Sequence, residues 1–492
     1  MDVRKILFLP SFLAAVGLIS CSGTKPPCTV NCGGGSTATV SVTMTAAPVT
    51  PPPNTNLLAF SVDVNTITLT PSTGTAVNIP LNSAAFSVDL TKLQSDSVFL
   101  GTSATVPVGS YTSMTVSISN PVVTFCTQTA GAAGCAAGSV TTITGAAAAP
   151  VITSAPFPLT LTSNQQTGLA LNLSLNSALT VSTTQAQVVT AVSLANALTV
   201  STLPSTSTSL AAGQLDFVED VTGTVTAVNT TTQSVTVQTA TRGSLTAVAN
   251  SSTVFSPNCA TFTFAACVVQ GQVASLDLAL NANGTFTLLE YDPLATSSGD
   301  WVDGIVTAPP SSSTQFSLVA NDVVLATSGS IINSSLVGAP VTAMLATPNP
   351  FLIDSKGLTI PTSSFTGTDA SIFLPGQTLS LHVTAFTAAS GTTPASISVD
   401  IVYLRFTRVS GTVATTGTQS AFNIASLPSF FGITTQPLVE ITLGAPPSTP
   451  ATNFDGVTSA TALSNPQTVS IRALYFGAAT AMPFSAAKVR VP

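Results

Sequence analysis

Side chains that could do chemistry are few in this sequence of 492 residues, which holds one histidine, His382. The stretch around it, Leu381-His382-Val383-Thr384, is typical of an alternating strand. His382 should therefore point away from its two apolar neighbours, toward solvent or a loop. One imidazole cannot build a metal cluster, and a catalytic triad would need a nucleophile and an acid from elsewhere in the chain. We therefore interpret His382 as a structural residue.

The only other catalytic pattern is Ser485-Ala486-Ala487-Lys488, which matches the S-x-x-K of serine acyltransferases. That motif needs a helix start to aim the lysine at the serine, yet this copy lies in a strand-like stretch near the end of the sequence. No K-T-G or S-D-N accompanies it. We interpret it as a chance match and predict no catalytic residues.

Acidic residues form two clusters. Asp216, Glu219 and Asp220 precede the first of three repeats, in a segment that we expect to be a linker. Glu290-Tyr291-Asp292 and Asp300-Trp301-Val302-Asp303 lie where the first repeat meets the second. Carboxylates at such a boundary could hold Ca²⁺, but they lack D-x-D-x-D spacing, and a charged linker is usually only solvated. We predict neither a metal nor a cofactor, with calcium at the junctions as an open alternative.

Trp301 is the only tryptophan, and Tyr291 lies ten positions before it. Two aromatic rings at a surface can stack on a sugar ring, which makes Trp301 and Tyr291 the candidate ligand-binding residues. The alternative is that Trp301 belongs to a β-sheet core, as a lone tryptophan more often does.

Cysteine usage indicates export. Six of the seven cysteines fall into local pairs, which are Cys28 with Cys32, Cys126 with Cys135, and Cys259 with Cys267. Short loops of this kind suit disulfides in an oxidising compartment, although proximity alone does not settle the connectivity. Zinc would require four Cys or His ligands, and no histidine lies near Cys28-x-x-x-Cys32.

The seventh cysteine, Cys21, ends a segment with the layout of a secretory signal. Arg4 and Lys5 precede an uncharged stretch, 6–18, that is too short for a transmembrane helix. Leu18-Ile19-Ser20-Cys21 resembles the bacterial lipobox, which implies cleavage before Cys21, a diacylglycerol on its thiol and acylation of the new amino terminus. Two or three acyl chains anchor a protein stably in a membrane. Ser22 after the cysteine favours the outer membrane, with the face of that membrane left open.

Composition narrows the possible partners. Only 6% of the residues are charged, and the net charge is −7. So few Lys and Arg cannot support counterion release from nucleic acid, which excludes that class of partner. Val, Ile, Thr and Phe abound, and the chain is too hydrophobic to be disordered. No later apolar run is long enough to be a second membrane anchor.

Alternating strands begin after a tether rich in Pro and Gly. Val40, Val42 and Met44 alternate with Ser and Thr, a pattern typical of strands that cover one face of a core. Three segments resemble parts of bacterial lipoproteins that carry domain of unknown function 4382. They are Val106-Pro107-Val108-Gly109-Ser110-Tyr111 with the strand after it, Phe86-Ser87-Val88-Asp89-Leu90, and Thr167-Gly168-Leu169-Ala170-Leu171-Asn172-Leu173. The resemblance covers about residues 38–200 and implies a β-sandwich on the cell envelope, with no chemistry.

The second half repeats. Val221-Thr222-Gly223-Thr224-Val225 recurs as Val302-Asp303-Gly304-Ile305-Val306 and as Val409-Ser410-Gly411-Thr412-Val413. Each unit ends alike, in Gly271-Gln272, Gly376-Gln377 or Pro466-Gln467 before a further strand. The opener resembles domain of unknown function 5666, which implies a small OB-like barrel, where glycine marks a strand bend.

We therefore predict an all-β chain, an N-terminal β-sandwich followed by tandem small β-barrel or β-sandwich modules. The predicted parts are a signal peptide at 1–20, a tether at 21–37, a sandwich at 38–200, and repeats at 217–300, 301–405 and 406–492.

Two classes of function stay open. We favour a non-enzymatic envelope lipoprotein with a structural or binding role, whose partner beside the membrane is a polysaccharide or an envelope protein. The alternative is a carboxylate-based glycan hydrolase, which needs two Asp or Glu side chains facing each other in a cleft, one with a raised pKa.

Overall fold

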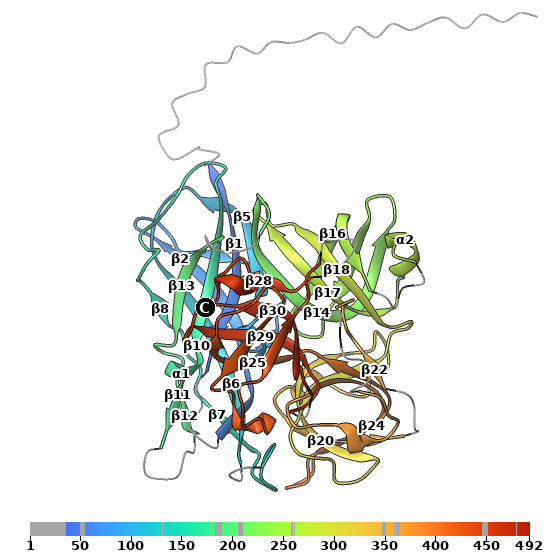
Figure 1. Ribbon diagram of the computed structural model, residues 1–492. Helices are drawn as coiled ribbons and strands as arrows, with labels where there is room; N and C mark the ends of the chain where they lie inside the picture. Colours follow the sequence, from blue (N-terminus) through green and yellow to red (C-terminus); the bar gives the residue numbers. More distant parts are fainter. Residues whose placement is uncertain are drawn as a thin grey trace, which may run out of the picture. The chain divides into compact units, whose positions relative to one another are not determined.

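Strands make up nearly all of the regular structure in the computed structural model of this chain (Figure 1). The structure describes residues 36–49, 55–128, 132–182, 189–204, 210–256, 259, 261–346, 351–358, 360, 365–444, 451–478 and 480–492. The predicted signal peptide, the lipidation site Cys21 and the pair Cys28 and Cys32 lie outside these ranges. No helix within them is long and apolar enough to cross a membrane. The predicted all-β fold class is confirmed.

The first N-terminal sheet is centred on β1 (Thr37–Ala47). This strand pairs in parallel with β10 (Gln166–Ser174) and antiparallel with β5 (Val98–Pro107), and β13 (Leu198–Leu203) extends the sheet beyond β10.

The second N-terminal sheet is built on two long strands, β2 (Thr55–Pro71) and β6 (Gly109–Thr127), which pair antiparallel. Five short strands complete it: β3 (Val77–Ile79), β4 (Phe86–Asp89), β7 (Thr141–Thr144), β8 (Val151–Ile152) and β9 (Leu159–Leu161). A further small unit consists of α1 (Leu175–Ala178) and the hairpin β11 (Leu179–Val181) and β12 (Val189–Val192).

Side chains of β1 alternate between its two faces, so one face packs in the sandwich core and the other contacts a neighbouring module. Val40, Val42 and Met44 are buried in the apolar core that the two sheets share. On the other face of the strand, the Thr43 hydroxyl donates to Asp216 Oδ2 at 2.7 Å. Both faces of β1 are therefore covered.

The P-x-G-x-Y stretch ties the start of β6 to the end of β5. Gly109 has a φ of +145°, a conformation that L side chains rarely adopt. Tyr111 is buried, and its hydroxyl donates to the Pro107 carbonyl oxygen at 2.7 Å.

Each of the three C-terminal repeats forms a small barrel. The first barrel consists of β14 (Gln214–Asn229), β15 (Ser234–Gln238), β16 (Ser244–Phe255), β17 (Val273–Asn281) and β18 (Phe286–Ala295). It closes in the order β14-β15-β16-β18-β17, with β16 and β18 parallel, and α2 (Phe264–Cys267) follows β16 in the chain.

The other two barrels repeat this order. The second barrel consists of β19 (Asp300–Val306), β20 (Gln315–Val324), β21 (Pro340–Leu345), β22 (Leu352–Ile353), β23 (Thr378–Thr387) and β24 (Ala395–Arg405). The third barrel consists of β25 (Thr407–Thr415), β26 (Ala421–Ala425), β27 (Leu438–Ile441), β28 (Asn453–Asp455), β29 (Thr468–Tyr475) and β30 (Phe484–Arg490). The parallel pairs β21 with β24 and β27 with β30 close them. This connectivity is that of OB-type barrels.

Short 3₁₀ turns interrupt the strands, at η1 (Lys92–Gln94), η2 (Ser334–Leu336), η4 (Ala370–Ile372), η5 (Ser429–Phe431) and η6 (Ala460–Ala462). Of these, η1 has a special position, because it lies among all three barrels.

The glycine of the repeated opener is explained by steric constraints. A Cβ atom added to Gly223 or Gly411 would clash with a carbonyl oxygen of the adjacent second strand, and one added to Gly304 would clash with the Leu318 side chain. Glycine at this position therefore lets the first two strands of each barrel approach closely.

The repeated glutamine of the closer has a hydrogen-bonding reason. In each barrel its side-chain oxygen accepts from the backbone N–H three residues earlier, at 2.8 Å for Gln272, 2.9 Å for Gln377 and 3.1 Å for Gln467. The glutamine side chain thus stabilises the turn that leads into β17, β23 or β29.

One boundary prediction is wrong. Asp216, Glu219 and Asp220 are not in a solvated linker but within β14, where all three are buried. The first barrel therefore begins at these residues, and their carboxylates must be satisfied inside the protein.

Candidate functional site

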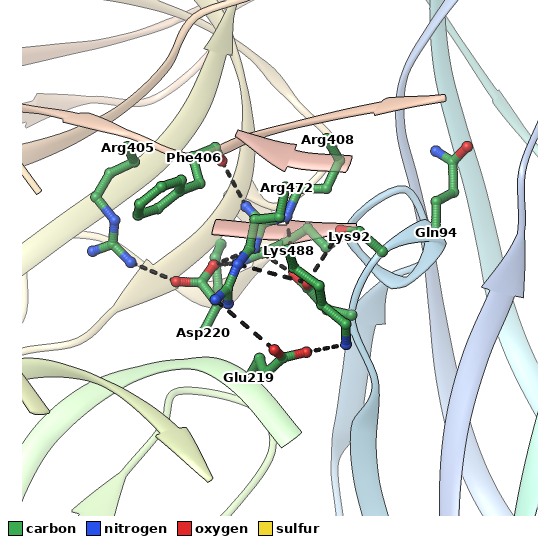
Figure 2. Close-up of polar contacts among 12 residues, drawn as sticks. Lys92, Gln94, Glu219, Asp220, Arg405, Phe406, Arg408, Arg472 and Lys488 are labelled. Atoms are coloured by element: carbon green, nitrogen blue, oxygen red, sulfur yellow. Dashed lines mark hydrogen bonds and ion pairs between the residues drawn. The ribbon is translucent and has the colours of Figure 1, made fainter. Parts of the chain in front are cut away.

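All the Lys and Arg side chains of the described residues lie in one buried ion network. The chain has 11 Lys and Arg, of which three fall in residues 1–35. The other eight each make at least one ion pair, and none of their side chains is more than 14% exposed: Lys92, Arg242, Lys356, Arg405, Arg408, Arg472, Lys488 and Arg490. Figure 2 shows the centre of this network, where side chains from the sandwich and the three barrels meet.

The segment around η1 joins the sandwich to the barrels. Lys92 Nζ lies 3.1 Å from a carboxylate oxygen of Asp220 in the first barrel and 3.1 Å from one of Asp322 in the second. Asp96, four residues on, accepts from the Arg408 guanidinium of the third barrel at 2.5 Å. These contacts come from one short segment, so residues 92–96 touch every barrel through charged groups.

Asp220 lies at the centre of the network. Its Oδ1 accepts from Arg405 at 2.5 Å, and its Oδ2 accepts from Arg408 at 2.7 Å and faces Lys92. Its backbone has a φ of +53°, and its N–H donates to Asp277 Oδ1 at 2.8 Å. Burial opposes ionisation, but the three cations outweigh it and hold the pKa of Asp220 well below its usual value.

Two further contacts join the first barrel to the third. Arg472 donates to both oxygens of Asp277, at 3.1 and 2.7 Å, a bidentate geometry that favours a strong pair. Lys488 donates to Glu219, and both side chains are almost fully buried. Burial raises the pKa of Glu219, although Lys488 and Arg472 act against that rise.

The charges occupy equivalent positions in the three barrels. The strand registers superpose four positions: the residue before the opener valine, one residue on β17, β23 or β29, and two residues on β18, β24 or β30. In the first barrel all four are acidic: Asp220, Asp277, Glu290 and Asp292. In the third barrel all four are basic: Arg408, Arg472, Lys488 and Arg490. In the second barrel they are Trp301, His382, Ile401 and Tyr403.

Equivalent positions meet each other across the interface. Asp220 pairs with Arg408, and Asp277 pairs with Arg472. The first and third barrels therefore contact each other through corresponding faces of opposite charge. The corresponding face of the second barrel packs through Trp301 and Tyr403 in a separate apolar cluster.

Lys356 enters the acidic face of the first barrel from the second barrel. Its Nζ lies 3.3 Å from Asp277 and 3.4 Å from Asp292, and its side chain is 2% exposed. Burial raises the pKa of Asp292 to about 7. Burial and the neighbouring Asp292 hold the pKa of Glu290 well above its usual value. Both carboxyls are therefore shifted toward the protonated form.

Little free space lies within the network. One cavity of about 20 Å³ borders Lys92 and Asp322, and another of about 60 Å³ borders Asp303 and Arg405. Both are of a size for one or a few water molecules. A larger groove of about 350 Å³ lies elsewhere, on the second barrel, between the η2 segment and residues 386–395.

The predicted aromatic platform does not form. Trp301 is fully buried, with its ring centroid 5.1 Å from that of His382 and 6.1 Å from that of Tyr403. Tyr291 is also fully buried, and its hydroxyl donates to Gln272 at 2.7 Å. The two rings belong to different core clusters and expose no face for a sugar, which corrects their assignment as ligand-binding residues.

The remaining candidates have structural contacts. His382 is partly exposed on β23, with Nδ1 2.6 Å from Asp400 Oδ1. Ser485 donates to Glu440 at 2.9 Å while Lys488 donates to Glu219, so the S-x-x-K residues serve separate contacts.

The structure also bears on the predicted cysteine pairs and on the possible metal site. Disulfides join Cys126 to Cys135 and Cys259 to Cys267, as proximity in the sequence predicted. In the ranges that the structure describes, no three His, Cys, Asp or Glu side chains are arranged to hold a metal ion. At the junction of the first two barrels, Asp292 faces Lys356, and Asp300 accepts from the Ser330 hydroxyl and the Ile331 N–H.

Sequence reasoning missed the network because it treated each acidic cluster locally. The available signal was the alignment of the three repeats, which brings the four acidic and the four basic residues into register.

The fold and the network together define an all-β, multi-module protein in which the described Lys and Arg side chains are turned inward. Residues 37–199 match the model of the family described as Domain of unknown function (DUF4382), which confirms the resemblance found in the N-terminal half. No curated protein matches the chain. No solved structure matches it either.

Proposed function

We propose that this protein is a non-enzymatic lipoprotein of the cell envelope, anchored by Cys21, with its sandwich and barrels acting as one rigid scaffold. The observation that carries the proposal is that seven of the eight described Lys and Arg side chains are buried in ion pairs between modules. The eighth, Arg490, pairs with Asp455 within the third barrel. Charged groups that would bind or transform a substrate in an enzyme are here used to hold modules together.

The surface that remains is nearly uncharged. Among the described residues, the acids with appreciable exposure are few, such as Asp63 and Asp369, and no Lys or Arg side chain accompanies them. Thr, Ser, Asn and Gln supply most of the exposed polar groups. Such a surface suits a neutral polymer, because hydroxyl and amide contacts are not screened by salt.

The groove on the second barrel is where we place polysaccharide binding. Its walls combine the half-buried Phe386 ring with the side chains of Asn333, Ser335 and Thr393. An aromatic face beside several hydroxyl and amide groups is the combination that carbohydrate rings require, since one face of a sugar is apolar and its edge is polar.

Retention of the Ser36–Pro492 unit on insoluble neutral polysaccharides and on isolated cell wall, at low and high salt, tests this binding. We expect salt-resistant retention that falls at least several-fold in Phe386→Ala. Phe262→Ala is the matched control, because Phe262 is 68% exposed on the first barrel and lies outside the groove. Equal losses in both variants, or retention that salt abolishes, would contradict a neutral-glycan groove. Retention on no matrix would favour an envelope protein as the partner.

The anchor has its own test. Labelling of the full chain with radioactive palmitate in a bacterial host should place label on the protein, and Cys21→Ala should remove it, because the thiol is the site of diacylglycerol transfer. Persistent label in Cys21→Ala would refute this attachment site.

The alternative, a carboxylate-based glycan hydrolase, has one observation in its favour. Glu290 and Asp292 lie two residues apart on the same side of β18, and both have raised pKa values. Their environment opposes the reaction, because Asp292 is fully buried and Lys356 blocks the space beside it. Release of reducing sugar by the wild-type protein and its loss in Glu290→Gln would establish the hydrolase in place of the scaffold.

A further inference from the structure

Lys356 and Asp292 are held together in conditions that do not suit an ordinary ion pair. Lys356 Nζ lies 3.4 Å from Asp292 Oδ2, and the two side chains are 2% and 0% exposed. No hydrogen-bond partner for Lys356 Nζ or for Glu290 Oε1 is present among the described residues, although both atoms are buried. Buried polar groups without partners cost free energy and are rare in native proteins. Several at one place therefore call for an explanation.

The two carboxyls that face Lys356 differ in chemical state. Asp277 lies 3.3 Å from Nζ, but its two oxygens also accept from the Arg472 guanidinium. Burial opposes ionisation of Asp277, yet Arg472 and Lys356 hold its pKa below the usual value. An ionised carboxylate is a poor electrophile. Asp292 has no guanidinium partner, and its pKa of about 7 keeps much of it protonated near neutrality.

We propose that the Lys356 amine and the Asp292 carboxyl condense to an intramolecular amide, with Glu290 relaying the proton. The bond would join the second barrel to β18 of the first barrel inside the ion network. It removes the charge of Lys356 and the titration of Asp292 from the protein interior, which relieves the cost of burying both. The inference does not depend on the proposed scaffold function, since it concerns the chemistry of this site alone.

The reaction balances without any co-reactant. A proton first passes from the Lys356 ammonium to the Asp292 carboxylate, which gives the free amine and the neutral carboxyl. The Nζ lone pair then attacks Asp292 Cγ, a C–N bond forms, the C–OH bond breaks, and one water molecule leaves. Glu290, two positions from Asp292 on the same side of β18, takes the amine proton and passes a proton to the departing hydroxyl. General acid–base groups held beside the reacting atoms serve this purpose.

Two features favour completion. Folding holds the amine and the carboxyl in contact, which raises their effective concentration by orders of magnitude. Exclusion of bulk water opposes hydrolysis of the product. Burial lowers the pKa of Lys356, but Asp277, Glu290 and Asp292 outweigh it and raise that pKa, so the free amine is scarce. A single turnover for each molecule tolerates such a slow step.

The intact mass of the Ser36–Pro492 protein, measured after reduction and alkylation, tests the proposal directly. We expect a mass lower than the sequence value by one water molecule. The full sequence mass in the folded protein would overturn the proposal, whatever the variants do.

Tryptic mapping locates the bond. Arg242, Lys356 and Arg405 are consecutive cleavage sites, and trypsin does not cut after an acylated lysine. The cross-linked protein should give peptide 243–405 intact and short of one water, whereas a free Lys356 gives 243–356 and 357–405. Loss of water from any other peptide would refute this pairing.

Variants test the roles of Lys356 and Glu290. Lys356→Met should keep the full mass, and Glu290→Gln should keep it or lose water at least tenfold more slowly. Glu440→Gln is the matched control, because Glu440 lies on β27 away from Lys356, and it should lose water as the wild type does. Unchanged cross-linking in Glu290→Gln would refute the relay, and cross-linking in Lys356→Met would refute the amine.

Discussion

The Glu219–Lys488 contact offers a direct measure of how strongly buried charge holds the barrels together. Both side chains are at most 1% exposed. Lys488→Met removes one charge and keeps most of the volume. Glu219 would then retain Arg472 at 3.9 Å and the Asn453 amide at 3.4 Å.

Breaking a buried ion pair by removing one partner costs roughly 3–5 kcal/mol. Because Arg472 and Asn453 still face the carboxylate, we expect Lys488→Met to cost about 3 kcal/mol of unfolding free energy. Glu219→Gln should cost a similar amount, since it leaves Lys488 with Asp455 at 3.9 Å and the face of the Phe217 ring at 5.5 Å. The double variant buries neither charge, so its cost should fall short of the sum by about 1–3 kcal/mol.

Urea unfolding of the Ser36–Pro492 protein supplies the measurement, with the fluorescence of the one tryptophan, Trp301, as a probe of the buried interior. Asp369→Asn is the control for loss of a charge, because Asp369 is exposed, and it should leave the midpoint unchanged. Additive effects of the two substitutions, within about 0.5 kcal/mol, would refute the direct coupling of Glu219 with Lys488.

Two further predictions concern the interface between the sandwich and the barrels. Burial raises the pKa of Asp216, so the folded protein binds this proton more tightly than the unfolded chain, and the resulting stability is lost as the pH rises. The unfolding free energy of the wild type, relative to that of Asp216→Asn, should therefore be higher at pH 4 than at pH 8. Urea midpoints that show the opposite order would contradict the raised pKa of Asp216. Replacing both Cys126 and Cys135 by Ala opens a loop of sequence separation 9 whose Cys135 N–H donates to the Thr307 carbonyl oxygen at 2.7 Å. This should cost about 2–3 kcal/mol, and an unchanged melting temperature would show that the disulfide does not stabilise the fold.

Local patterns predicted most of the fold. The alternation of Val40, Val42 and Met44 identified a strand because each strand position has only two possible faces. The opener glycines and closer glutamines identified the repeats because each fills one local need, close strand approach or a turn hydrogen bond. These features depend on neighbours a few residues away along the chain or across one strand pair.

The charge network could not be found in the same way. Lys92 and Asp322 are 230 positions apart, and Asp96 and Arg408 are 312 apart. Read locally, Asp220 and its neighbours are typical of a solvated linker, because acidic residues are usually exposed. Only packing of the modules shows that these carboxylates have guanidinium and ammonium partners. Trp301 was misassigned for a related reason, since a surface and a module interface look alike in sequence.

Alignment of the repeats, in contrast, carries information about the interface. Asp277, His382 and Arg472 occupy one structural position in three barrels of the same connectivity. If all three barrels kept an acid there, packing them together would bury like charges, at a cost of several kcal/mol. The same face is acidic in the first barrel, aromatic in the second and basic in the third. The first barrel can therefore pair with the third, whereas two faces of the same charge would repel each other. The differences among the repeats thus specify one arrangement of the modules.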